Sequence, residues 1–429
     1  MRAYRRLLRR RAFALLWTGA TISALGDGLS WIALVWLLLE LGGSSGSIGL
    51  LVAAYTGPVI VSGLVAGHLL DRFDRRRVLI VDNVIRGLAI ASIPILSATG
   101  NLATWQLYAV AIVYGSLFMI SLAGVPTLIA SLVPDDELTT ANAMETMSYA
   151  IGGLAGPALA GLLSGVFGAS NVLLLDAASY GAFALCLVAM RAGLAADRDT
   201  AGDHDPPTAS AVAQRDGGHG FGQALRFVRR TPAILAITLM FMAFNVGEGM
   251  VTVMLPVYVR EVIGGNATAY GLLATSFAAG ILAGSFIVGA VHWRWPLGRS
   301  IAAAQATAGA VLLGLAFRPD LFGAAAVLAG SGFAASSLTA WAQTIRMRLI
   351  PAELRGRVFA LLRTLMQSTP PIGGLLAGFM LTGGQVTGVA IAVAVLIALP
   401  GAVGSVIPAL GREATGEAEP AGAIADAGS

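Results

Sequence analysis

Residues 67–77 read Gly-His-Leu-Leu-Asp-Arg-Phe-Asp-Arg-Arg-Arg and separate two long apolar stretches of the chain. The stretches 47–70 and 78–98 on either side each reach the length of about 20 apolar residues that a helix needs to cross a bilayer. Arginine and lysine accumulate in cytoplasmic loops, so four arginines in one short connection predict that it faces the cytoplasm. The segment therefore predicts two transmembrane helices joined on the cytoplasmic side.

The whole chain shares this apolar character. Of its 429 residues, 56% are hydrophobic and 12% are charged, whereas soluble domains carry about 25% charged residues. A chain with so few charges could not cover a water-facing surface, so we predict an all-α polytopic membrane protein. All 27 basic residues are arginine. This excludes phosphate-loop ATPases and Schiff-base enzymes, since both need a lysine.

Further apolar segments bring the number of predicted transmembrane helices to twelve. They span residues 12–39, 47–70, 78–98, 103–127, 139–163, 170–190, 232–257, 268–291, 299–316, 321–342, 357–382 and 386–409. Loops predicted on one side hold nearly all the arginines, and the other side holds only Arg260 and Arg318. Both termini are therefore expected in the cytoplasm. A single cysteine, Cys186, and four scattered histidines predict no disulfide within the chain and no metal site.

The two halves of the chain match each other at a fixed offset of 222 residues, although glycine is common and any single match carries little weight. The matched pairs are Gly49 with Gly271, Gly67 with Gly289, Arg72 with Arg294, Arg77 with Arg299, Gly152 with Gly374, Gly156 with Gly378 and Gly161 with Gly383. We therefore predict two parallel six-helix bundles related by an axis along the membrane normal. The expected parts are a bundle over 1–190, a cytoplasmic linker over 191–231, a bundle over 232–410 and a disordered cytoplasmic tail over 411–429.

Two motifs resemble those of the major facilitator superfamily. Residues 67–77 are similar to the signature between helices 2 and 3 of that superfamily, with Asp74 in place of its second glycine. Their form resembles the exporter group that contains enterobactin exporters and macrolide efflux proteins. The fifth span resembles the Gly-Pro signature of drug:proton antiporters through Gly152, Gly156, Pro157 and Gly161. Many drug antiporters also carry an arginine in helix 4, whereas span 103–127 here has no charge.

The resemblance implies a cytoplasmic gate built on residues 67–77, in which Asp71, Arg72 and Arg76 latch the two halves together in the outward-facing state. An alternative for the arginines from Arg75 onward is that they set topology and touch anionic headgroups. Asp82 and Arg86 share a helix face at a spacing of four, which predicts a self-neutralised pair. The gate candidates are Gly67, Asp71, Arg72, Arg75, Arg76, Asp82 and Arg86.

Charged residues inside spans are functional candidates because burying them in hydrocarbon is costly. Asp27 in the first span and Glu248 in the seventh each lie between two glycines, at nearly equivalent places in the halves. Helices 1 and 7 line the central cavity in superfamily members, so we predict that these two carry protons, bind a cationic group, or both. Hydrogen-bonded packing against neighbouring helices is the alternative. Further candidates for substrate contact are Trp31, Asn245, Trp341 and Gln343, and buried charges without an assigned role are Glu145, Asp176 and Arg363.

These features predict a secondary active transporter that exports a lipophilic or amphiphilic small molecule, such as a drug, antibiotic or siderophore, by alternating access and proton antiport. The Gly-Pro signature favours export over import by the same fold, and a non-transporting sensor or assembly protein is a further alternative. We expect no cofactor beyond the proton gradient and no enzymatic activity. The expected partners are the substrate, protons and the lipid bilayer, without nucleic acid. The expected setting is a monomer in a bacterial plasma membrane.

Overall fold

The computed structural model describes residues 2–134, 137–197, 219–290, 295–351 and 354–411, and this part of the chain is helical and contains no strand. The predicted all-α class is confirmed. The elements are α1 (Arg2–Arg9), α2 (Arg11–Glu40), α3 (Ser45–Thr56), α4 (Val59–Arg72), α5 (Arg75–Ala98), α6 (Thr104–Leu132), α7 (Leu138–Phe167), α8 (Ala169–Asp197), α10 (His219–Arg230), α11 (Pro232–Tyr258), the π-helix η1 (Val259–Ile263), α12 (Ala267–Ala290), α13 (Leu297–Leu312), the 3-10 helix η2 (Leu313–Phe317), α14 (Leu321–Ala335), α15 (Leu338–Leu349), α16 (Arg355–Gln367), α17 (Pro370–Leu381), α18 (Val386–Val406) and α19 (Pro408–Gly411).

Within the described residues, 11 helical segments are long and apolar enough to cross a membrane, against twelve predicted. The predicted span that falls short is 357–382, which is divided into α16 and α17. Pro370 and Pro371 begin α17, and proline lacks the N–H group that a continuous helix would donate. The Thr369 hydroxyl donates a hydrogen bond of 2.7 Å to the Met366 carbonyl. This bond helps to satisfy backbone acceptors where the helix is interrupted.

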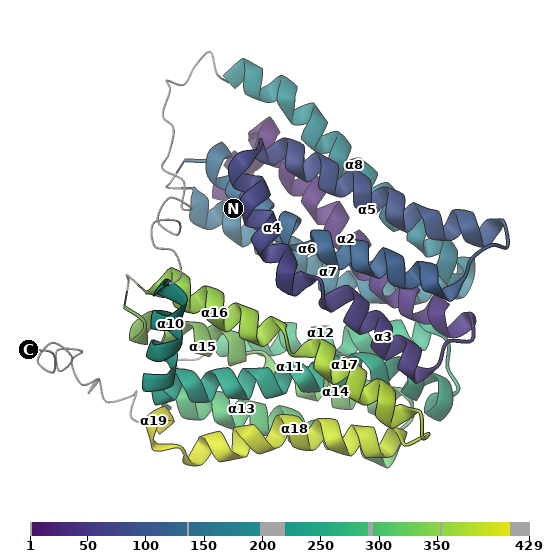
Figure 1. Cartoon of the computed structure of the whole chain (residues 1–429), viewed down its shortest axis with the longest axis vertical. Coiled ribbons are helices and arrows are strands. Elements are labelled where there is room, and N and C mark those ends of the chain that lie inside the picture. The colour runs from purple at the N-terminus through teal and green to yellow at the C-terminus, as the bar shows by residue number, and fades with distance from the viewer. Residues whose placement is uncertain (1, 135–136, 198–218, 291–294, 352–353, 412–429) are drawn as a thin grey trace, which may run out of the picture.

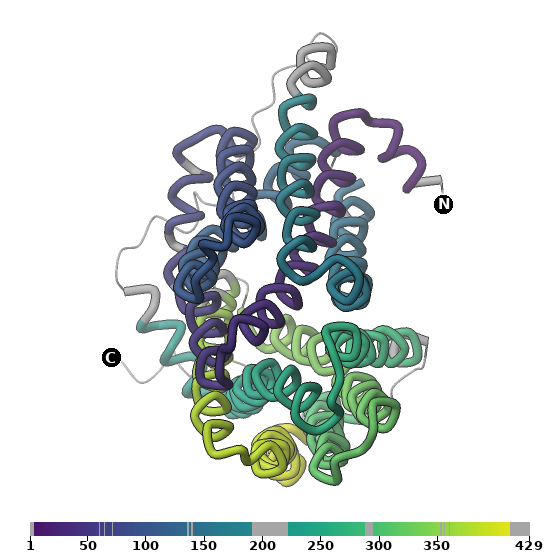
Figure 2. Tube along the Cα trace, turned by 90° about the vertical axis from the view of Figure 1, so that its right-hand side faces the viewer, coloured from purple at the N-terminus to yellow at the C-terminus, as the bar shows by residue number. Residues whose placement is uncertain are grey.

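The helices form two bundles (Figure 1). In the N-terminal bundle, α2–α8, the central helix α2 packs against α7 and α8, and α5 packs against α8. In the C-terminal bundle, α11–α18, helix α11 packs against α17 and α18, and α13 packs against α18. Figure 2 shows the two groups one above the other, with α3 reaching down to the C-terminal bundle.

Equivalent helices of the two bundles begin at two regular spacings. Helices α12 and α13 begin 222 residues after α3 and α5, whereas α14, α16 and α18 begin 217 residues after α6, α7 and α8. The change arises because the third span and its following loop occupy 75–103 in one half but only 297–320 in the other. The single offset of 222 is therefore wrong for the last three spans. Gly156 corresponds to Gly373, and Gly161 corresponds to Gly378.

Each bundle is preceded by a short arginine-rich helix, and the sequence patterns above did not predict either one. In α1, Leu7 is buried. Arg6 of α1 and Arg10, which lies between α1 and α2, form salt bridges of 3.4 and 3.3 Å with Glu137, just before α7. Helix α10 instead packs through buried apolar residues, among them Val228, against α16. The predicted linker thus holds a helix from His219 to Arg230, and the linker residues 198–218 lie outside the described part.

The two bundles are joined at the end of the molecule opposite to α10 and α19, where α3 packs against α17 and α7 against α12. A Cβ on Gly49 would lie 2.7 Å from the Gly374 carbonyl, and a Cβ on Gly271 would overlap the Pro157 carbonyl in the same way. These two contacts are equivalent under the repeat and require glycine for the close approach of the backbones.

Polar and aromatic contacts close the same end. Arg260 donates to the Leu39 carbonyl at 3.0 Å, and Thr268 donates to the Gly161 carbonyl at 3.0 Å. The rings of Trp36 and Tyr270 stack with centroids 6.5 Å apart. Toward the other end, where α10 and α19 lie, the bundles diverge (Figure 1).

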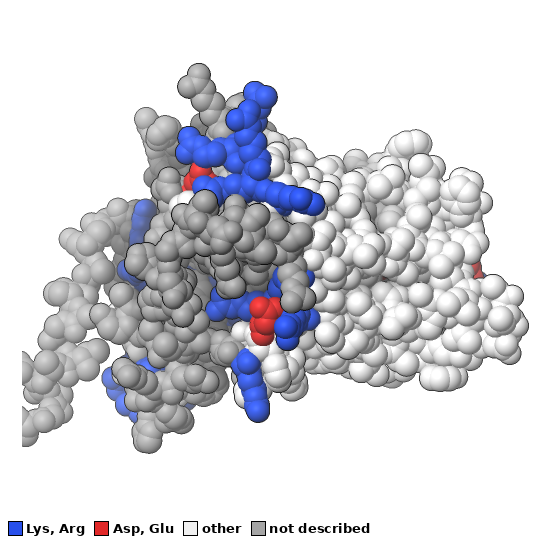
Figure 3. Space-filling model, turned by 90° about the horizontal axis from the view of Figure 1, so that it is seen from above, with Lys and Arg blue, Asp and Glu red and all other residues white. Residues whose placement is uncertain are grey.

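Charge is concentrated at the diverging end. In Figure 3 the arginine side chains and most acidic side chains of the visible face gather at one end, and the long remainder is almost free of charge. By the positive-inside rule this end is the predicted cytoplasmic side. The main contacts between the bundles therefore lie toward the predicted exterior, and the bundles diverge toward the predicted cytoplasm.

Candidate functional site

Asp27 is the meeting point of three helices in the N-terminal bundle. It lies on α2, and its Oδ1 accepts hydrogen bonds from the hydroxyls of Tyr114 on α6 and Tyr180 on α8. The two rings meet edge-on with centroids 6.1 Å apart. Both tyrosines are buried, whereas Asp27 is half-buried. Two neutral donors therefore stabilise a carboxylate that is still partly accessible.

A buried arginine lies behind the two tyrosines. The Arg86 guanidinium is 5.3 Å from the ring centroid of Tyr114 and 5.7 Å from that of Tyr180. It also forms the predicted pair with Asp82, at 3.2 Å, with both side chains almost fully buried. A further hydrogen bond of 2.8 Å reaches the Leu117 carbonyl on α6. Helix α6, the fourth span, has no charged residue of its own. The arginine that contacts it, Arg86, comes from α5, the third span.

Asp176 on α8 completes this arrangement. It is fully buried and accepts hydrogen bonds from Ser30 on α2 and, at 3.0 Å, from Ser179. Asp27, Asp82 and Asp176 thus each have hydrogen-bond donors from the protein. We call Asp27, Asp82, Arg86, Tyr114, Asp176 and Tyr180 the polar network.

The glycines beside Asp27 explain how the network can be so compact. A Cβ on Gly26 would overlap the side chains of Asp176 and Ser179, and a Cβ on Gly28 would lie 2.5 Å from the Gly152 carbonyl. Gly26 and Gly28 therefore let α8 and α7 approach α2 closely. Gly152 and Gly156 of the antiporter-like motif make the matching contacts from α7, while Pro157 and Gly161 contact Gly271 across the bundles.

Glu248 has different surroundings from its counterpart Asp27. It lies in the middle of α11 and its side chain is exposed. Among the described residues, no hydrogen-bond donor or cation meets its carboxylate. A charge at the centre of a bilayer costs about 2.5–3.5 kcal/mol on the insertion scale. An unpaired carboxylate here therefore needs a proton, water or a bound group to compensate it.

The C-terminal bundle has no counterpart of the polar network. Small or apolar residues, or a single serine, occupy the positions that correspond by the helix offsets. Asp82 corresponds to Ala304, Arg86 to Ala308, Tyr114 to Ser331, Asp176 to Val393 and Tyr180 to Ile397.

The other predicted contact residues lie in different environments. Trp31 packs against Tyr55 in a tilted arrangement with centroids 5.2 Å apart. Asn245 is held by a hydrogen bond of 2.9 Å to the Met366 carbonyl. Trp341 is buried in a core cluster of the C-terminal bundle, and Gln343 is exposed. Their part in substrate binding remains a prediction.

The segment 67–77 is only partly described, because the side chain of Asp71 lies outside the described residues. Gly67 has open space around it, and Arg72 is exposed. Arg76 donates to the carbonyls of Leu187 and Val188 on α8, the latter at 3.1 Å. These contacts tie α5 to α8 within one bundle while the bundles are apart at this end.

Two neighbours in this segment have local roles. Arg75 donates to the Thr127 carbonyl on α6 at 3.4 Å. Asp74 caps α5, since its side chain accepts a hydrogen bond of 2.8 Å from the Arg77 backbone. The departure from the glycine of the family signature thus supplies a helix N-cap.

Glu145 on α7 and Arg363 on α16 belong to different bundles and make no ion pair in this state. Glu145 is half-buried and Arg363 is exposed. Their role remains a prediction.

Residue types alone did not identify Tyr114, Tyr180 and Arg346. The two tyrosines occur in apolar runs and carry no local motif. Arg346 is buried over the Phe241 ring at 5.2 Å and donates to the Met366 sulfur at 3.4 Å. The available signal was the spacing of four residues between Asp176 and Tyr180, which places both on one face of α8.

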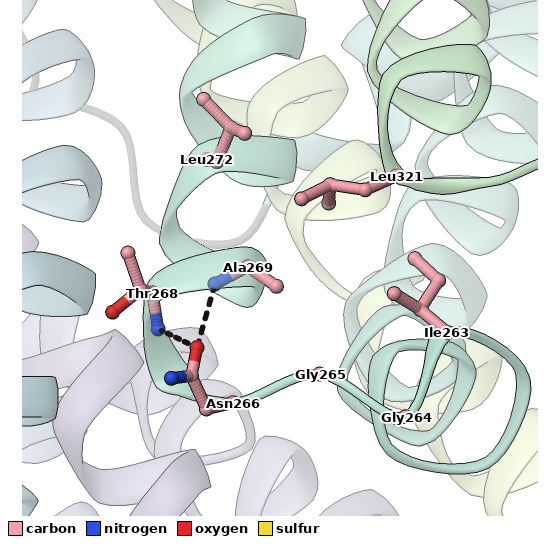
Figure 4. Close-up of a pocket in the computed structure, with 8 residues that line it drawn as sticks. All are labelled: Ile263, Gly264, Gly265, Asn266, Thr268, Ala269, Leu272 and Leu321. Carbon is pink, nitrogen blue, oxygen red and sulfur yellow. Dashed lines mark hydrogen bonds between the residues drawn. The ribbon is translucent and has the colours of Figure 1, made fainter.

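A surface pocket lies at the end where the bundles are joined, next to η1 and the beginning of α12. It is separate from Asp27 and Glu248. Ile263, Gly264 and Leu321 line it, and the Asn266 side chain accepts hydrogen bonds from the backbone of Thr268 and Ala269 (Figure 4). It contains no ionisable side chain. Within the described residues, no group of His, Cys, Asp and Glu is arranged to hold a metal ion.

Comparisons with known proteins agree with this architecture. The sequence profile described as transmembrane secretion effector, of the major facilitator superfamily, matches residues 6–418. The multidrug efflux pump Tap of Mycolicibacterium fortuitum is 25% identical over 405 residues, covering 93% of this chain and 95% of that protein. Macrolide efflux protein A of Streptococcus pyogenes is 21% identical over 279 residues, covering 65% of this chain and 66% of that protein.

Solved structures show the same fold. A bacterial homologue of the human lysosomal transporter Spinster, in an inward-facing and unoccupied conformation, aligns with a TM-score of 0.63 at 14% identity, covering 93% of this chain and 96% of that one. The nucleoside transporter NupG aligns with a TM-score of 0.67 at 12% identity, covering 92% and 98%.

Proposed function

The chain belongs to the transmembrane secretion effector family of the major facilitator superfamily, and from this premise we propose that it exports lipophilic or amphiphilic small molecules from a bacterial cell. Membership makes it a multi-pass membrane transporter and not an enzyme. The relatives named multidrug efflux pump and macrolide efflux protein support the direction and the substrate class. The match over residues 6–418 is the observation that carries this proposal.

Alternating access follows from the paired contacts between the bundles. In the observed state the bundles are joined at the α3–α17 and α7–α12 contacts and diverge toward the end where α10 and α19 lie. These contacts are made by glycines, so the backbones can slide without large side chains interlocking. Rocking of the bundles about this region would expose the space between them to the other side.

We propose further that Asp27 carries the proton that drives export. The carboxylate is accessible enough to exchange a proton, and its tyrosine donors stabilise the charged form. Protonation at Oδ2 adds a donor and makes Oδ1 a weaker, uncharged acceptor, so the hydrogen bonds from Tyr114 and Tyr180 weaken. Because the tyrosines lie against Arg86, this change reaches the packing of α5, α6 and α8. The proton state of Asp27 is thereby linked to the geometry of the N-terminal bundle.

The energetic requirement is modest. One charge moved through a membrane potential of 100 mV supplies about 2.3 kcal/mol. That free energy sustains a concentration ratio of about fifty-fold for a neutral substrate. No nucleotide or cofactor is needed in this scheme.

Expression in an efflux-deficient bacterium tests the proposal. We expect lower accumulation of labelled lipophilic compounds in expressing cells, and restoration of accumulation by an uncoupler. Accumulation that rises on expression would instead indicate an importer. Unchanged accumulation across the whole panel would contradict transport of this substrate class.

A further inference from the structure

We propose that the two short helices before the bundles, α1 and α10, are equivalent docking surfaces for anionic phospholipids of the cytoplasmic leaflet. The groups that bind the lipid phosphates are arginines on the outward side of each helix, namely Arg5, Arg9, Arg226 and Arg230. The apolar side chains next to them, Tyr4 and Leu225, enter the boundary between headgroups and acyl chains. This inference goes beyond the proposed export function and does not depend on which molecule is exported.

The two helices are equivalent parts of the internal repeat. Helix α11 begins 221 residues after α2, and the same offset places α1 on the last eight residues of α10. It aligns two pairs of identical arginines, one pair of exposed apolar residues and one pair of buried apolar residues: Arg5 with Arg226, Arg9 with Arg230, Tyr4 with Leu225 and Leu7 with Val228. Residue type and exposure therefore agree along both helices.

The inward faces of the two helices differ in their chemistry. On the N-terminal side, Arg6 and Arg10 form ion pairs with Glu137. The counterparts of these arginines are Phe227 and Thr231, and α10 is held against α16 by apolar packing that includes Phe227. The way each helix is attached to its bundle therefore does not explain the arginines that the two helices share.

The outward faces of the two helices are alike. Tyr4 is 38% exposed and Leu225 is 37% exposed, and the four shared arginines are exposed as well. Within the described part of the chain, no ion pair or hydrogen bond reaches any of these four arginines. The two arginines of each helix are one turn apart and so lie on one side of it. Free cations beside an apolar side chain are typical of helices that lie in the headgroup layer.

Membrane topology alone does not require this arrangement. The positive-inside rule depends on how many arginines a loop contains and not on which face of a helix they occupy. A repeated face, with the same two cations and an apolar residue at the same place, indicates a common partner for both helices.

The position of the two helices favours the membrane as that partner. Only Arg10 separates α1 from α2, and only Thr231 separates α10 from α11, so each helix lies where the first span of its bundle begins. The far ends of α2 and α11 meet at the contact between Leu39 and Arg260, which places both short helices at the opposite, predicted cytoplasmic end (Figure 1). The cytoplasmic leaflet has a negative surface potential. Because the helices belong to different bundles, a partner that surrounds the molecule fits both faces at once.

Docking of this kind would act on the two bundles equally. Each short helix is joined directly to the first span of its bundle, and lipid bound to it fixes the depth of that span in the membrane. The two bundles then keep the same level while they rock against each other.

The test measures binding of phosphatidylglycerol and of phosphatidylcholine with the same acyl chains to the delipidated full chain in detergent, by native mass spectrometry. We expect the native protein to prefer phosphatidylglycerol, since each basic residue near an anionic headgroup contributes about five-fold to binding. Arg5→Gln with Arg9→Gln should weaken phosphatidylglycerol binding at least about five-fold, and Arg226→Gln with Arg230→Gln should do the same. Binding of phosphatidylcholine should stay within about two-fold in both variants.

Arg6→Gln with Arg10→Gln is the matched control, because it removes the same number of charges next to the same span from side chains that are paired with Glu137. It should leave phosphatidylglycerol binding within about two-fold. Lysine at Arg5 and Arg9 keeps the charge and should retain part of the binding, which separates loss of charge from loss of structure.

Three results would overturn the inference. The first is equal affinity of the native protein for the two lipids. The second is an equal loss in the control variant, because the preference would then follow total charge and not the outward face. The third is displacement of phosphatidylglycerol by inorganic phosphate at the same concentration, because the surface would then recognise the phosphate group without the lipid.

Discussion

The two bundles share a backbone plan but differ in the charge of their cores. Equivalent helices begin at regular spacings, and the glycine contacts Gly49–Gly374 and Gly271–Pro157 repeat across the molecule. The N-terminal bundle nevertheless buries Asp82, Asp176 and Arg86 and half-buries Asp27, each with partners. The C-terminal bundle has alanines at the positions of the buried ion pair, and its central carboxylate is unpaired. The shared backbone plan fits the proposed rocking motion, and the difference in charge fits the proposed proton site in the N-terminal bundle.

The largest effect should come from breaking the ion pair that only one bundle has. Arg86→Ala leaves Asp82 buried without its cation, and such losses cost about 3–5 kcal/mol. We expect this loss in the free energy of unfolding in detergent, measured by chemical denaturation. Replacing both residues by leucine should recover most of the stability. A single variant as stable as the native protein would show that the network does not hold the bundle together.

The second largest effect should come from removing one of the two tyrosine hydroxyls that donate to Asp27. Tyr114→Phe deletes a hydrogen bond to a charged group, worth about 1.5–3 kcal/mol. We expect proton-driven efflux to fall about ten-fold or more, as followed with a fluorescent cation in everted vesicles. The matched change in the other bundle is Ser331→Ala, which should leave efflux within about two-fold. Equal losses in the two variants would argue against a special role for the network.

The glycine contacts should behave alike in both halves. Gly49→Ala and Gly271→Ala each place a methyl group against a facing carbonyl, and overpacking of this kind costs about 1–3 kcal/mol. We expect similar reductions of efflux, about ten-fold, in the same vesicles. Gly153→Ala, where nothing lies within 4 Å, is the control. A loss confined to one of the two contacts would break the proposed symmetry of the rocking motion.

The smallest effect should be at the helices that precede the bundles. Arg6 and Arg10 are 66% and 41% exposed, so changing both to glutamine should cost less than about 1 kcal/mol. Val228→Ala removes buried apolar atoms from α10 and should cost about 1.5 kcal/mol at about 0.8 kcal/mol for each buried carbon. Thermal unfolding of both variants checks the order. The reverse order would mean that Glu137 is the stronger anchor.

Much of the fold followed from patterns that act along one helix. Apolar length and the placement of arginine predicted the spans and their orientation, and the spacing of Asp82 and Arg86 predicted their pair. The broken span at Pro370 and the helix α10 were harder. A helix break and a short amphipathic helix depend on what packs against them, and Val228 shows its role only against α16.

The candidate site was predictable in part. Asp27 and Glu248 were singled out because charge is rare in membrane spans. The difference in their surroundings was not predictable from the sequence, because Tyr114 and Tyr180 are 87 and 153 residues from Asp27. The single offset of 222 failed where the third span of the second half shortens. Contacts between helices far apart in sequence, which no local spacing encodes, separate the paired carboxylate from the unpaired one.

The most direct test of the central claim is proton coupling at Asp27. Proteoliposomes carrying the native protein or Asp27→Asn would be given an imposed pH gradient, and accumulation of a labelled lipophilic cation would be followed with and without an uncoupler. The account predicts that the native protein accumulates the cation against its gradient, whereas Asp27→Asn only equilibrates it. Undiminished, uncoupler-sensitive accumulation by Asp27→Asn would contradict the assignment of the proton to the N-terminal bundle.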